Sequence, residues 1–442
     1  MPLEVLMTTY HPESTTRSDL PVAALPVAVI GAGPVGLAAT AHLSQRGIPS
    51  LLLERSNTVG AHVREWGHVR LFSPWRYVMD PVSRELLTAH GWTAPEPDTF
   101  PTGHDLVERY LEPLAAIPDV ARRLHLGHRV VHVGRLGIDK TRDAGRNSAP
   151  FVVVAEGPAG TVRFEARAII DASGTWSQPN PLGAEGFEAI GESAHADQIH
   201  RGIPDILGAD RQRYAGRRVA VVGSGHSAQN AILDLAGLSE PPAAIHWVVR
   251  RDGAGQMFGG GTDDQLPARG ALGDRARRLI DGGTVDFVTG FHVGRVEDAP
   301  HGIQLVAQDG RHLGPLDAVI AATGQRPDLE FLRELRLDLD PSLECSRALG
   351  PMIDPNLHSC GTVPPHGAEE LAHPEPDVYV VGHKSYGRAP TFLLLTGYEQ
   401  VRSVVAALVG DHAAAAAVEL TLPETGVCCT DRPQADTVTS CC

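Results

Sequence analysis

Short apolar runs alternate with helix-like segments near the start of the chain. Val27–Ile30 leads into a glycine-rich turn at 31–33, and Pro34–Gln45 has the apolar spacing of a helix. Leu51–Glu54 is a second apolar run, and it ends on a carboxylate. A strand, a glycine turn, a helix and a second buried strand form the opening unit of a doubly wound sheet.

The same pattern returns in the second half of the chain. The apolar run at 219–222 leads into Gly223-Ser224-Gly225, a helix-like segment follows, and Ile245–Val249 is the next predicted strand. Further apolar runs at 285–288 and 316–324 complete the unit. The sequence therefore predicts an α/β fold with two Rossmann-like dinucleotide-binding domains.

The remaining pattern indicates that the second domain is inserted into the first. Strand-like runs at 129–138, 151–155 and 161–170 precede it, and a strand at 378–381 with an amphipathic helix at Thr391–Leu408 follows it. A proline- and glycine-rich connector at the end of the first part favours a boundary there. We expect a disordered N-terminus (1–25), a first domain in two parts (26–185 and 325–422), an inserted domain (186–324) and a disordered, cysteine-containing tail (423–442).

The charge of the chain excludes one broad class of partner. The formal net charge is −15, whereas binding to nucleic acid or to an anionic membrane surface requires positive charge. No charge-free apolar stretch reaches the ~18 residues of a membrane span, and residues 1–25 lack the regions of a secretory signal. We therefore expect a cytoplasmic protein that binds neither nucleic acid nor a membrane.

Gly31, Gly33 and Gly36 have the spacing of a dinucleotide fingerprint. The first glycine permits the tight turn after the strand, the second lets a pyrophosphate approach the backbone, and the third permits close packing of helix on sheet. Pro34 begins the helix, whose N-terminus offers free N–H groups to a phosphate. Glu54, about twenty residues further on, is the carboxylate that accepts hydrogen bonds from a ribose. These residues predict the first nucleotide site.

The second fingerprint differs from the first at two points. Ala228 occupies the position of the third glycine, and the second strand ends on Arg250 and Arg251 where the first unit has Glu54. Arginine binds phosphate through paired hydrogen bonds, so this site favours the 2′-phosphate of NADPH over NADH. A solvated basic edge without a nucleotide role is the alternative. The predicted NADPH contacts are Gly223, Ser224, Gly225, Ser227, Ala228, Arg250, Arg251, Thr323 and Gly324.

Two nucleotide sites of different preference indicate a nicotinamide and a flavin on one chain. With these parts the chain resembles the two-dinucleotide-binding flavoproteins, and within them the flavin-containing monooxygenases. Segments 64–74 and 101–111 are similar to family stretches near the flavin, and 321–324 to a linker motif. The resemblance implies FAD in the first site. The predicted FAD contacts are Gly31, Gly33, Pro34, Gly36, Glu54, Arg55, Trp66, Leu71, Val131, Ala172, Ser173, Gly174, Gly382 and Thr391.

One motif of that family is incomplete in this chain. Gly191 and His195 fit the monooxygenase fingerprint, but Ala189 and Ile199 stand where the fingerprint has aromatic residues. We expect NADPH to reduce FAD, and reduced FAD with O2 to oxygenate a soft nucleophilic small molecule. An NADPH-dependent flavin reductase or oxidase without oxygen insertion stays open as an alternative.

The substrate expectation comes from a second, narrower resemblance. Segments 358–367, 384–392 and 423–428 resemble monooxygenases encoded beside bacterial arsenic-resistance genes, which implies a trivalent arsenical. Trivalent arsenic favours soft thiolates, so Cys428 and Cys429 are candidate metalloid ligands. The alternatives are a tail with incidental thiols, and a metalloid-binding flavoprotein that keeps its cofactors structurally.

The cysteines and histidines predict no metal site. None of the six cysteines forms a C-x-x-C pair, and the spacing of His358, Cys360, His366 and His373 matches no zinc template. A long chain without a secretory signal carries thiols rather than structural disulfides. The sequence assigns no catalytic acid or base.

Overall fold

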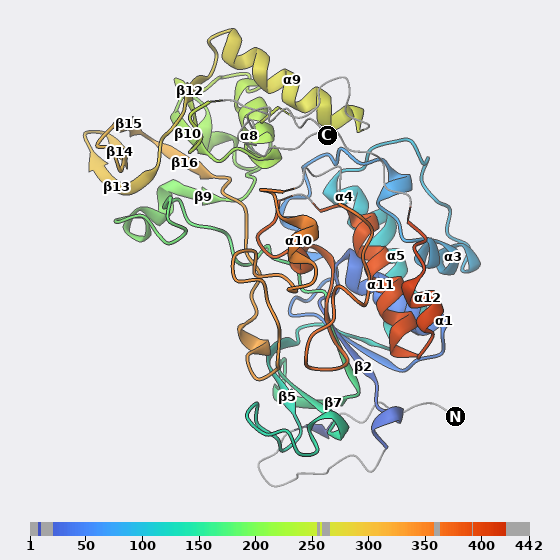
Figure 1. Ribbon diagram of the computed structural model, residues 1–442. Coiled ribbons are helices and arrows are strands. Elements are labelled where there is room, and N and C mark those ends of the chain that lie inside the picture. Colours follow the sequence, from blue (N-terminus) through green and yellow to red (C-terminus); the bar gives the residue numbers. More distant parts are fainter. Residues whose placement is uncertain are drawn as a thin grey trace, which may run out of the picture. The chain divides into compact units, whose positions relative to one another are not determined.

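The chain folds into two compact units (Figure 1). The computed structural model describes residues 8–9, 21–253, 257–258, 266–357, 363–390 and 392–420. Unit 1 is built from the chain up to Ser177 and from Pro327–Met352 and Pro364–Leu422, whereas Gln178–Arg326 forms the body of unit 2. Unit 2 is therefore inserted into unit 1. The boundaries lie at 177/178 and 326/327, where the sequence predicted 185/186 and 324/325.

Unit 1 contains a parallel sheet of five strands in the order β17-β8-β2-β3-β4. Every neighbouring pair in it is parallel. The apolar runs found in the sequence supply its centre, because a strand buried on both faces needs apolar residues at every position. The strands are β2 (Val27–Ile30), β3 (Ser50–Leu53), β4 (Leu124–His125), β8 (Ala168–Asp171) and β17 (Val378–Val380).

An antiparallel sheet covers one face of this parallel sheet. Ala28 and Ile30 of β2 share a core cluster with Val133, Phe151 and Phe164 from the antiparallel strands. The run 161–170, predicted as one strand, is two strands that belong to different sheets, β7 and β8. The antiparallel order is β1 (Thr8–Thr9), β7 (Gly160–Ala166), β6 (Phe151–Gly157) and β5 (Arg129–Arg135).

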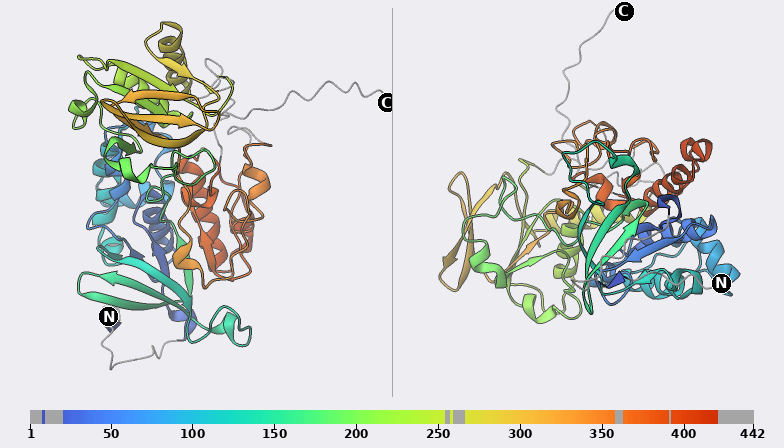
Figure 2. Two further views of the ribbon diagram at one scale, coloured as in Figure 1. Left: turned by 90° about the vertical axis from the view of Figure 1, so that its left-hand side faces the viewer. Right: turned by 90° about the horizontal axis from the view of Figure 1, so that it is seen from below.

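Helices cover the other face of the parallel sheet. Helix α1 (Pro34–Gln45) is buried along most of its length and packs against α11 (Leu394–Leu408), which lies beside it in red in Figure 2. The sequence predicted this last helix from Thr391, but it begins at Leu394. The other helices of unit 1 are α2 (Ala61–Glu65), α3 (Pro81–Ala89), α4 (Gly103–Leu106), α5 (Glu112–Ala116), α6 (Pro118–Ala121), α10 (Gly350–Ile353) and α12 (His412–Ala416).

Unit 2 contains a five-stranded parallel sheet in the order β12-β11-β10-β16-β9. Four of its strands, β16-β10-β11-β12, repeat the order β8-β2-β3-β4 of unit 1, whereas the edge strand β9 comes first in sequence and its counterpart β17 comes last. A three-stranded antiparallel sheet lies between β12 and β16 in sequence. The strands are β9 (Ile199–Arg201), β10 (Arg218–Val222), β11 (Ala244–Val248), β12 (Asp286–Val288), β13 (Val293–Ala299), β14 (Gly302–Ala307), β15 (His312–Leu316) and β16 (Ala318–Ala321). The helices are α7 (Arg211–Tyr214), α8 (His226–Ala236) and α9 (Pro267–Asp281).

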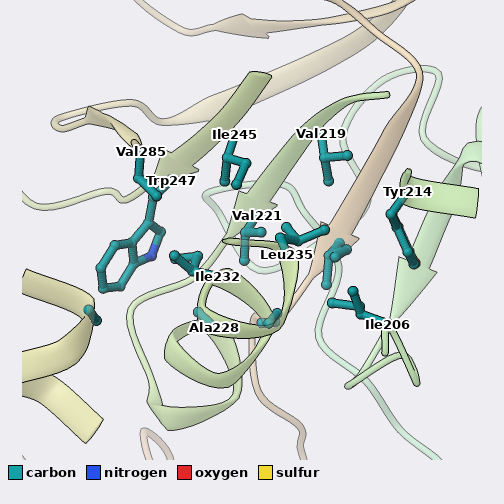
Figure 3. Packing of buried hydrophobic residues seen from close by; sticks show 14 of the residues in the cluster. Ile206, Tyr214, Val219, Val221, Ala228, Ile232, Leu235, Ile245, Trp247 and Val285 are labelled. Atoms are coloured by element: carbon teal, nitrogen blue, oxygen red, sulfur yellow. The ribbon is translucent and has the colours of Figure 1, made fainter. Parts of the chain in front are cut away.

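Strand β10 divides its side chains between two cores. Val219 and Val221 point into a cluster with Ile232 of α8 and Trp247 of β11 (Figure 3). Val222 belongs to the cluster on the opposite face. This alternation follows from the two-residue period of a strand. An apolar run of four consecutive residues therefore fixes a central strand with a core on each side.

Two further sequence expectations concern the ends of the chain and membranes. Within 1–25, where no regular structure was predicted, Thr8–Thr9 pairs with β7 and Val22–Ala24 forms a 3-10 turn. Among the described residues, no helix is long and apolar enough to cross a membrane.

Candidate dinucleotide-binding sites

The first fingerprint is a turn that tolerates no side chain on its inner side. Gly31 has a φ of +98°, and a Cβ added there would lie 2.8 Å from the carbonyl oxygen of Ala172. A Cβ on Gly36 would lie 1.8 Å from the carbonyl oxygen of Gly31. Gly33, in contrast, has open space on its Cβ side. The turn is thus packed against the end of β8 and open beside the N-terminus of α1, where a pyrophosphate fits.

Glu54 is held directly at this turn. Its side chain is buried, and one carboxylate oxygen accepts a hydrogen bond of 2.8 Å from the Ala32 amide. The other oxygen accepts a hydrogen bond of 2.8 Å from the Ser56 amide. The structure therefore brings the predicted ribose partner to the predicted phosphate cradle, with lone pairs left on each oxygen for a hydroxyl donor.

The other predicted FAD contacts are distributed over several elements of unit 1. Arg55 is exposed and hydrogen-bonds the His62 ring; burial, and then the charge of Arg55, lower the pKa of His62. The Trp66 ring packs against Gly103, and the Leu71 amide donates to Pro101 at 2.9 Å. Val131 is a half-buried residue of β5. Thr391 lies outside the described residues.

Gly382 completes the group of residues beside the first fingerprint. It follows β17 with a φ of +71°, and a Cβ there would lie 3.2 Å from the side chain of Val35 in α1. Its amide donates a hydrogen bond of 2.8 Å to the side chain of Gln400. The fold therefore brings Gly382 to the same cradle as Gly31 and Ala172, although these residues are far apart in sequence.

The second fingerprint has the same construction. Gly223 has a φ of +136°, and a Cβ there would lie 2.1 Å from the carbonyl oxygen of Ala322. Gly225 has open space on its Cβ side at the N-terminus of α8. Ala228 is fully buried in the α8 core, where it replaces the third glycine. Ser224 and Ser227 are half-buried in this turn and in the first turn of α8.

Arg250 and Arg251 follow β11 on the rim of the second site. The Arg250 side chain is exposed and donates a hydrogen bond of 3.2 Å to the Ala184 carbonyl. The Arg251 carbonyl accepts a hydrogen bond of 2.6 Å from the Gly290 amide, which fixes the backbone of this rim. Both arginines thus follow directly beyond the carboxyl end of β11. Their predicted contact with a 2′-phosphate stays a prediction.

Thr323 and Gly324 are hydrogen-bonded to the connector that contains Asn180. The Thr323 hydroxyl donates to the Asn180 carbonyl at 2.6 Å, and the Asn180 amide donates to Gly324 at 2.9 Å. The two connectors of unit 2 are therefore tied together at this point. The predicted contact of both residues with NADPH stays a prediction.

The incomplete monooxygenase motif is a structural turn in unit 2. A Cβ on Gly191 would lie 2.2 Å from the Val296 carbonyl oxygen, and the His195 ring bonds the Gly191 carbonyl at 2.8 Å. Ala189 and Ile199 are buried. Close backbone packing against β13 thus explains the presence of Gly191 and His195 without a catalytic role.

A buried ion pair beside the first site was missed in the sequence. Lys384 Nζ lies 2.6 Å from a carboxylate oxygen of Asp171, and neither side chain is exposed. Lys384 also donates to the Ser173 hydroxyl at 3.0 Å, across 211 positions of sequence. It therefore fixes the turn at 171–174 that packs on Gly31. No local pattern predicts such a pair, because Asp171 ends β8 whereas Lys384 lies far away in sequence, in a 3-10 turn after β17.

The candidate thiols lie largely outside the described residues. Cys345 is described, is buried and forms no disulfide, whereas Cys360, Cys428 and Cys429 lie outside the described residues. Within the described part of the chain, no three histidine, cysteine or acidic side chains gather as metal ligands. His366 and His373 each bond a nearby chain segment instead, at the Pro364 carbonyl and the Asp338 amide.

Family models match both units of the chain. A model for pyridine nucleotide-disulphide oxidoreductases matches residues 144–346, and one for NAD(P)-binding Rossmann-like domains matches residues 29–83. Each match contains one of the two fingerprints. The chain has the fold of the two-dinucleotide flavoprotein oxidoreductases. The predicted fold class is thereby confirmed.

Individual relatives agree with this assignment of the fold. Indole-3-pyruvate monooxygenase YUCCA6 from Arabidopsis thaliana is 29% identical over 220 residues, which are 49% of this chain and 46% of that protein. The chain thus spans about half the length of this curated relative. Bacillithiol disulfide reductase Bdr from Bacillus cereus superimposes with a TM-score of 0.63 at 18% identity, over 88% of this chain and 99% of that one.

A flavin-containing monooxygenase is also among the similar solved structures. The flavin-containing monooxygenase from Stenotrophomonas maltophilia superimposes with a TM-score of 0.54 at 21% identity, over 88% of this chain and 98% of that one. Monooxygenases and reductases thus share this fold, so the fold by itself does not choose between them. Together the matches support a fold with two dinucleotide-binding units.

Proposed function

We propose that the chain is an NADPH-dependent FAD monooxygenase acting on a soft nucleophilic small molecule. NADPH, a proton, O2 and the substrate give NADP⁺, water and a substrate with one added oxygen atom. The observation that carries the proposal is the pair of cradles. Each has a glycine closed against the neighbouring strand, at Gly31 and Gly223, and a second glycine open at a helix N-terminus, at Gly33 and Gly225.

Different residues bind the two cofactors. In unit 1 the open side of Gly33 and the N-terminus of α1 hold a pyrophosphate, and Glu54 accepts from the ribose. In unit 2 Arg250 and Arg251 bind the 2′-phosphate of NADPH. FAD, when bound, accepts a hydride and supplies electrons to dioxygen. The chain contributes binding and orientation of the cofactors.

An oxygen balance tests the proposal. Purified protein is loaded with FAD and given NADPH in air, with thioethers, thiols, arsenite and methylated trivalent arsenicals as acceptors. One acceptor is expected to consume one NADPH and one O2 for each oxygenated product, with little hydrogen peroxide. Protein that takes up no FAD and leaves NADPH untouched overturns the proposal.

A reductase or oxidase without oxygen insertion is the second candidate. It is favoured by the structural role of Gly191 and His195 and by the disulfide reductase among the structural relatives. In the same assay, this alternative predicts that each NADPH oxidised to NADP⁺ yields one hydrogen peroxide from O2, or one reduced acceptor, with every compound tested.

A trivalent arsenical is the first substrate we propose to test. Trivalent arsenic is a soft acceptor for thiolates, and three segments of the sequence carry the resemblance. The candidate thiol Cys428 ends one of these segments, and Cys429 directly follows it. Arsenite that stimulates NADPH oxidation and leaves as arsenate supports this substrate. Tight arsenite binding that is lost in Cys428→Ser, without any stimulation, supports the metalloid-binding alternative.

A further inference from the structure

Three parallel strands of unit 1 end at one edge, and His383 follows the last of them. Strands β2, β8 and β17 are parallel neighbours, so their carboxyl ends lie together. Gly31 follows β2, Thr175 comes shortly after β8, and His383 comes three residues after β17. Ligands of open α/β sheets bind at this edge, outside the carboxyl ends of the strands.

The backbone beside His383 is fixed against the fingerprint helix. The Gly382 amide is hydrogen-bonded to Gln400, which is fully buried in α11. A Cβ on Gly382 would lie 3.2 Å from Val35, in the first turn of α1. The distance between His383 and the phosphate cradle is therefore set by packed elements rather than by a loop.

The imidazole ring is held on two sides. Its Nδ1 lies 3.1 Å from the hydroxyl oxygen of Thr175, and its centroid lies 5.8 Å from that of the Phe392 ring. Phe392 in turn makes an edge contact with Tyr386, at 5.2 Å between centroids. Among the described residues, Nε2 makes no hydrogen bond, so the side chain is oriented through one nitrogen and keeps the other for a ligand.

The His383 side chain is exposed, so a ligand can reach the ring. Desolvation by the surrounding protein lowers the pKa of His383 to about 4. The imidazole is therefore neutral at neutral pH, and Nε2 offers one donor or one acceptor.

We propose that His383 contacts the flavin of the FAD site, with Nε2 hydrogen-bonded to the isoalloxazine ring and Thr175 fixing the imidazole through Nδ1. This inference rests on the FAD-dependent function proposed above. The isoalloxazine ring presents carbonyl oxygens and ring nitrogens, and hydrogen bonds to them tune its electronics. His383 thereby sets part of the reduction potential of bound FAD, and Thr175 is its positioning residue.

The test is the midpoint potential and visible spectrum of FAD bound to purified holoprotein. His383→Phe keeps a ring beside Phe392 but removes Nε2, and we expect about a tenfold change in the equilibrium constant for flavin reduction, ~30 mV for a two-electron couple. His383→Gln, which restores a polar group, should lie nearer the wild type. Thr175→Val, which frees the ring, should shift the potential in the same direction by less.

The matched control is His312→Phe, an exposed histidine on β15 of unit 2. A potential and spectrum in His383→Phe that equal those of His312→Phe, with FAD still bound, overturn the role of His383. If His383→Phe does not fold, an unchanged potential in Thr175→Val has the same meaning. Wild-type protein that takes up no FAD overturns the proposed function instead, so the two failures are distinguishable.

Discussion

Arg250 allows the nucleotide preference to be tested at the scale of a single side chain. Its guanidinium is exposed beyond β11 and donates a hydrogen bond of 3.2 Å to the Ala184 carbonyl. A charge-assisted hydrogen bond contributes ~1.5–3 kcal/mol, which corresponds to roughly a ten- to hundredfold preference for NADPH. We expect Arg250→Ala to reduce the ratio of kcat/KM for NADPH over NADH by about that factor, measured with FAD-loaded protein.

The control for this variant is Arg295→Ala. Arg295 is an exposed arginine of β13 in the same unit, paired with Glu297 at 2.9 Å. Its removal changes the net charge equally, so it should leave the ratio near the wild-type value. An NADPH/NADH ratio in Arg250→Ala that matches the control would remove Arg250 from the site and leave Arg251 as the sole candidate.

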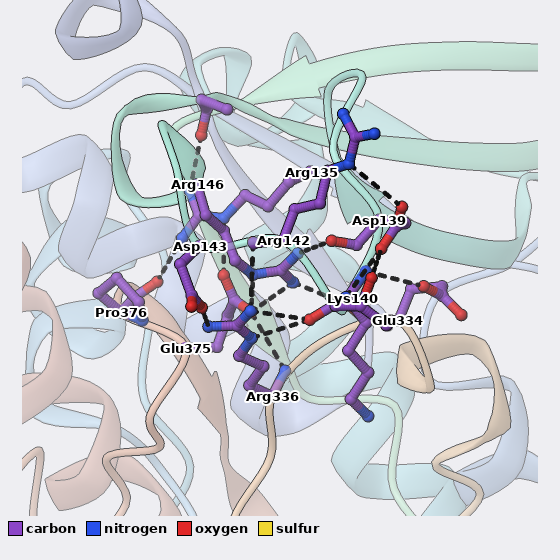
Figure 4. A network of polar contacts seen from close by, with 12 residues as sticks. Arg135, Asp139, Lys140, Arg142, Asp143, Arg146, Glu334, Arg336, Glu375 and Pro376 are labelled. Atoms are coloured by element: carbon purple, nitrogen blue, oxygen red, sulfur yellow. Dashed lines mark hydrogen bonds and ion pairs between the residues drawn. The ribbon is translucent and has the colours of Figure 1, made fainter.

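At the scale of elements, one buried carboxylate joins segments of unit 1 that are distant in sequence. Glu375 precedes β17, and its side chain is fully buried. It binds Arg135 of β5 at 2.8 Å and Arg146 at 2.6 Å, and it accepts from the Arg336 amide at 3.1 Å (Figure 4). The Glu375 carboxylate therefore links the antiparallel sheet, the chain segment that returns from unit 2, and strand β17.

Glu375→Gln tests how much this tie stabilises the fold. Removal of the charge leaves two buried guanidinium groups without a counter-charge, which costs about 3–5 kcal/mol. We expect a fall of that size in the free energy of urea unfolding at pH 7. Glu156→Gln breaks an exposed pair with Arg129 on the neighbouring strand and should cost less than about 1 kcal/mol.

The pH dependence of this difference has a definite sign. Burial raises the pKa of Glu375, but hydrogen bonds from Arg146 and Arg135 outweigh it and hold the pKa below the ordinary value. The stabilisation is therefore present above the ordinary glutamate pKa, ~4.3, and is lost as the pH falls through the lower pKa of the folded state. A stability difference between wild type and Glu375→Gln that grows in acid would contradict this account.

At the scale of the whole molecule, the two units should respond to their nucleotides separately. A ligand at 100 times its Kd stabilises the state that binds it by ~2.7 kcal/mol. A Cβ at Gly33 or Gly225 meets no protein atom within 4 Å, so a valine at either position is compatible with the folded unit. The valine side chain would occupy space that the bound nucleotide needs. Gly33→Val should lose the thermal shift caused by FAD, and Gly225→Val the shift caused by NADP⁺.

Each of these variants controls for the other. Gly33→Val should keep its response to NADP⁺, and Gly225→Val should keep its response to FAD, both read by calorimetry. If one variant loses both responses, the two sites are not independent units of binding. If neither variant loses any, the open sides of Gly33 and Gly225 are not where the nucleotides lie.

The sequence by itself determined the parts that depend on near neighbours. The strand at Val27–Ile30, the helix at Pro34–Gln45 and the repeat of both in unit 2 were predicted with these bounds or close to them. Glycine turns, capping prolines and apolar periods act within a few residues, so they can be recognised from the sequence alone. The same reasoning proposed Gly31, Gly33 and Glu54 as nucleotide contacts, because their spacing is fixed by one strand–helix–strand unit.

Only the tertiary structure decided which distant residues share a site. Lys384 and Ser173 meet across 211 positions, and His383 and Thr175 across 208. The chain leaves unit 1 and returns to it, and parallel strand ends meet at one edge regardless of their order in sequence. A buried ion pair or an oriented imidazole has no period and no local motif, so packing alone brings its partners together.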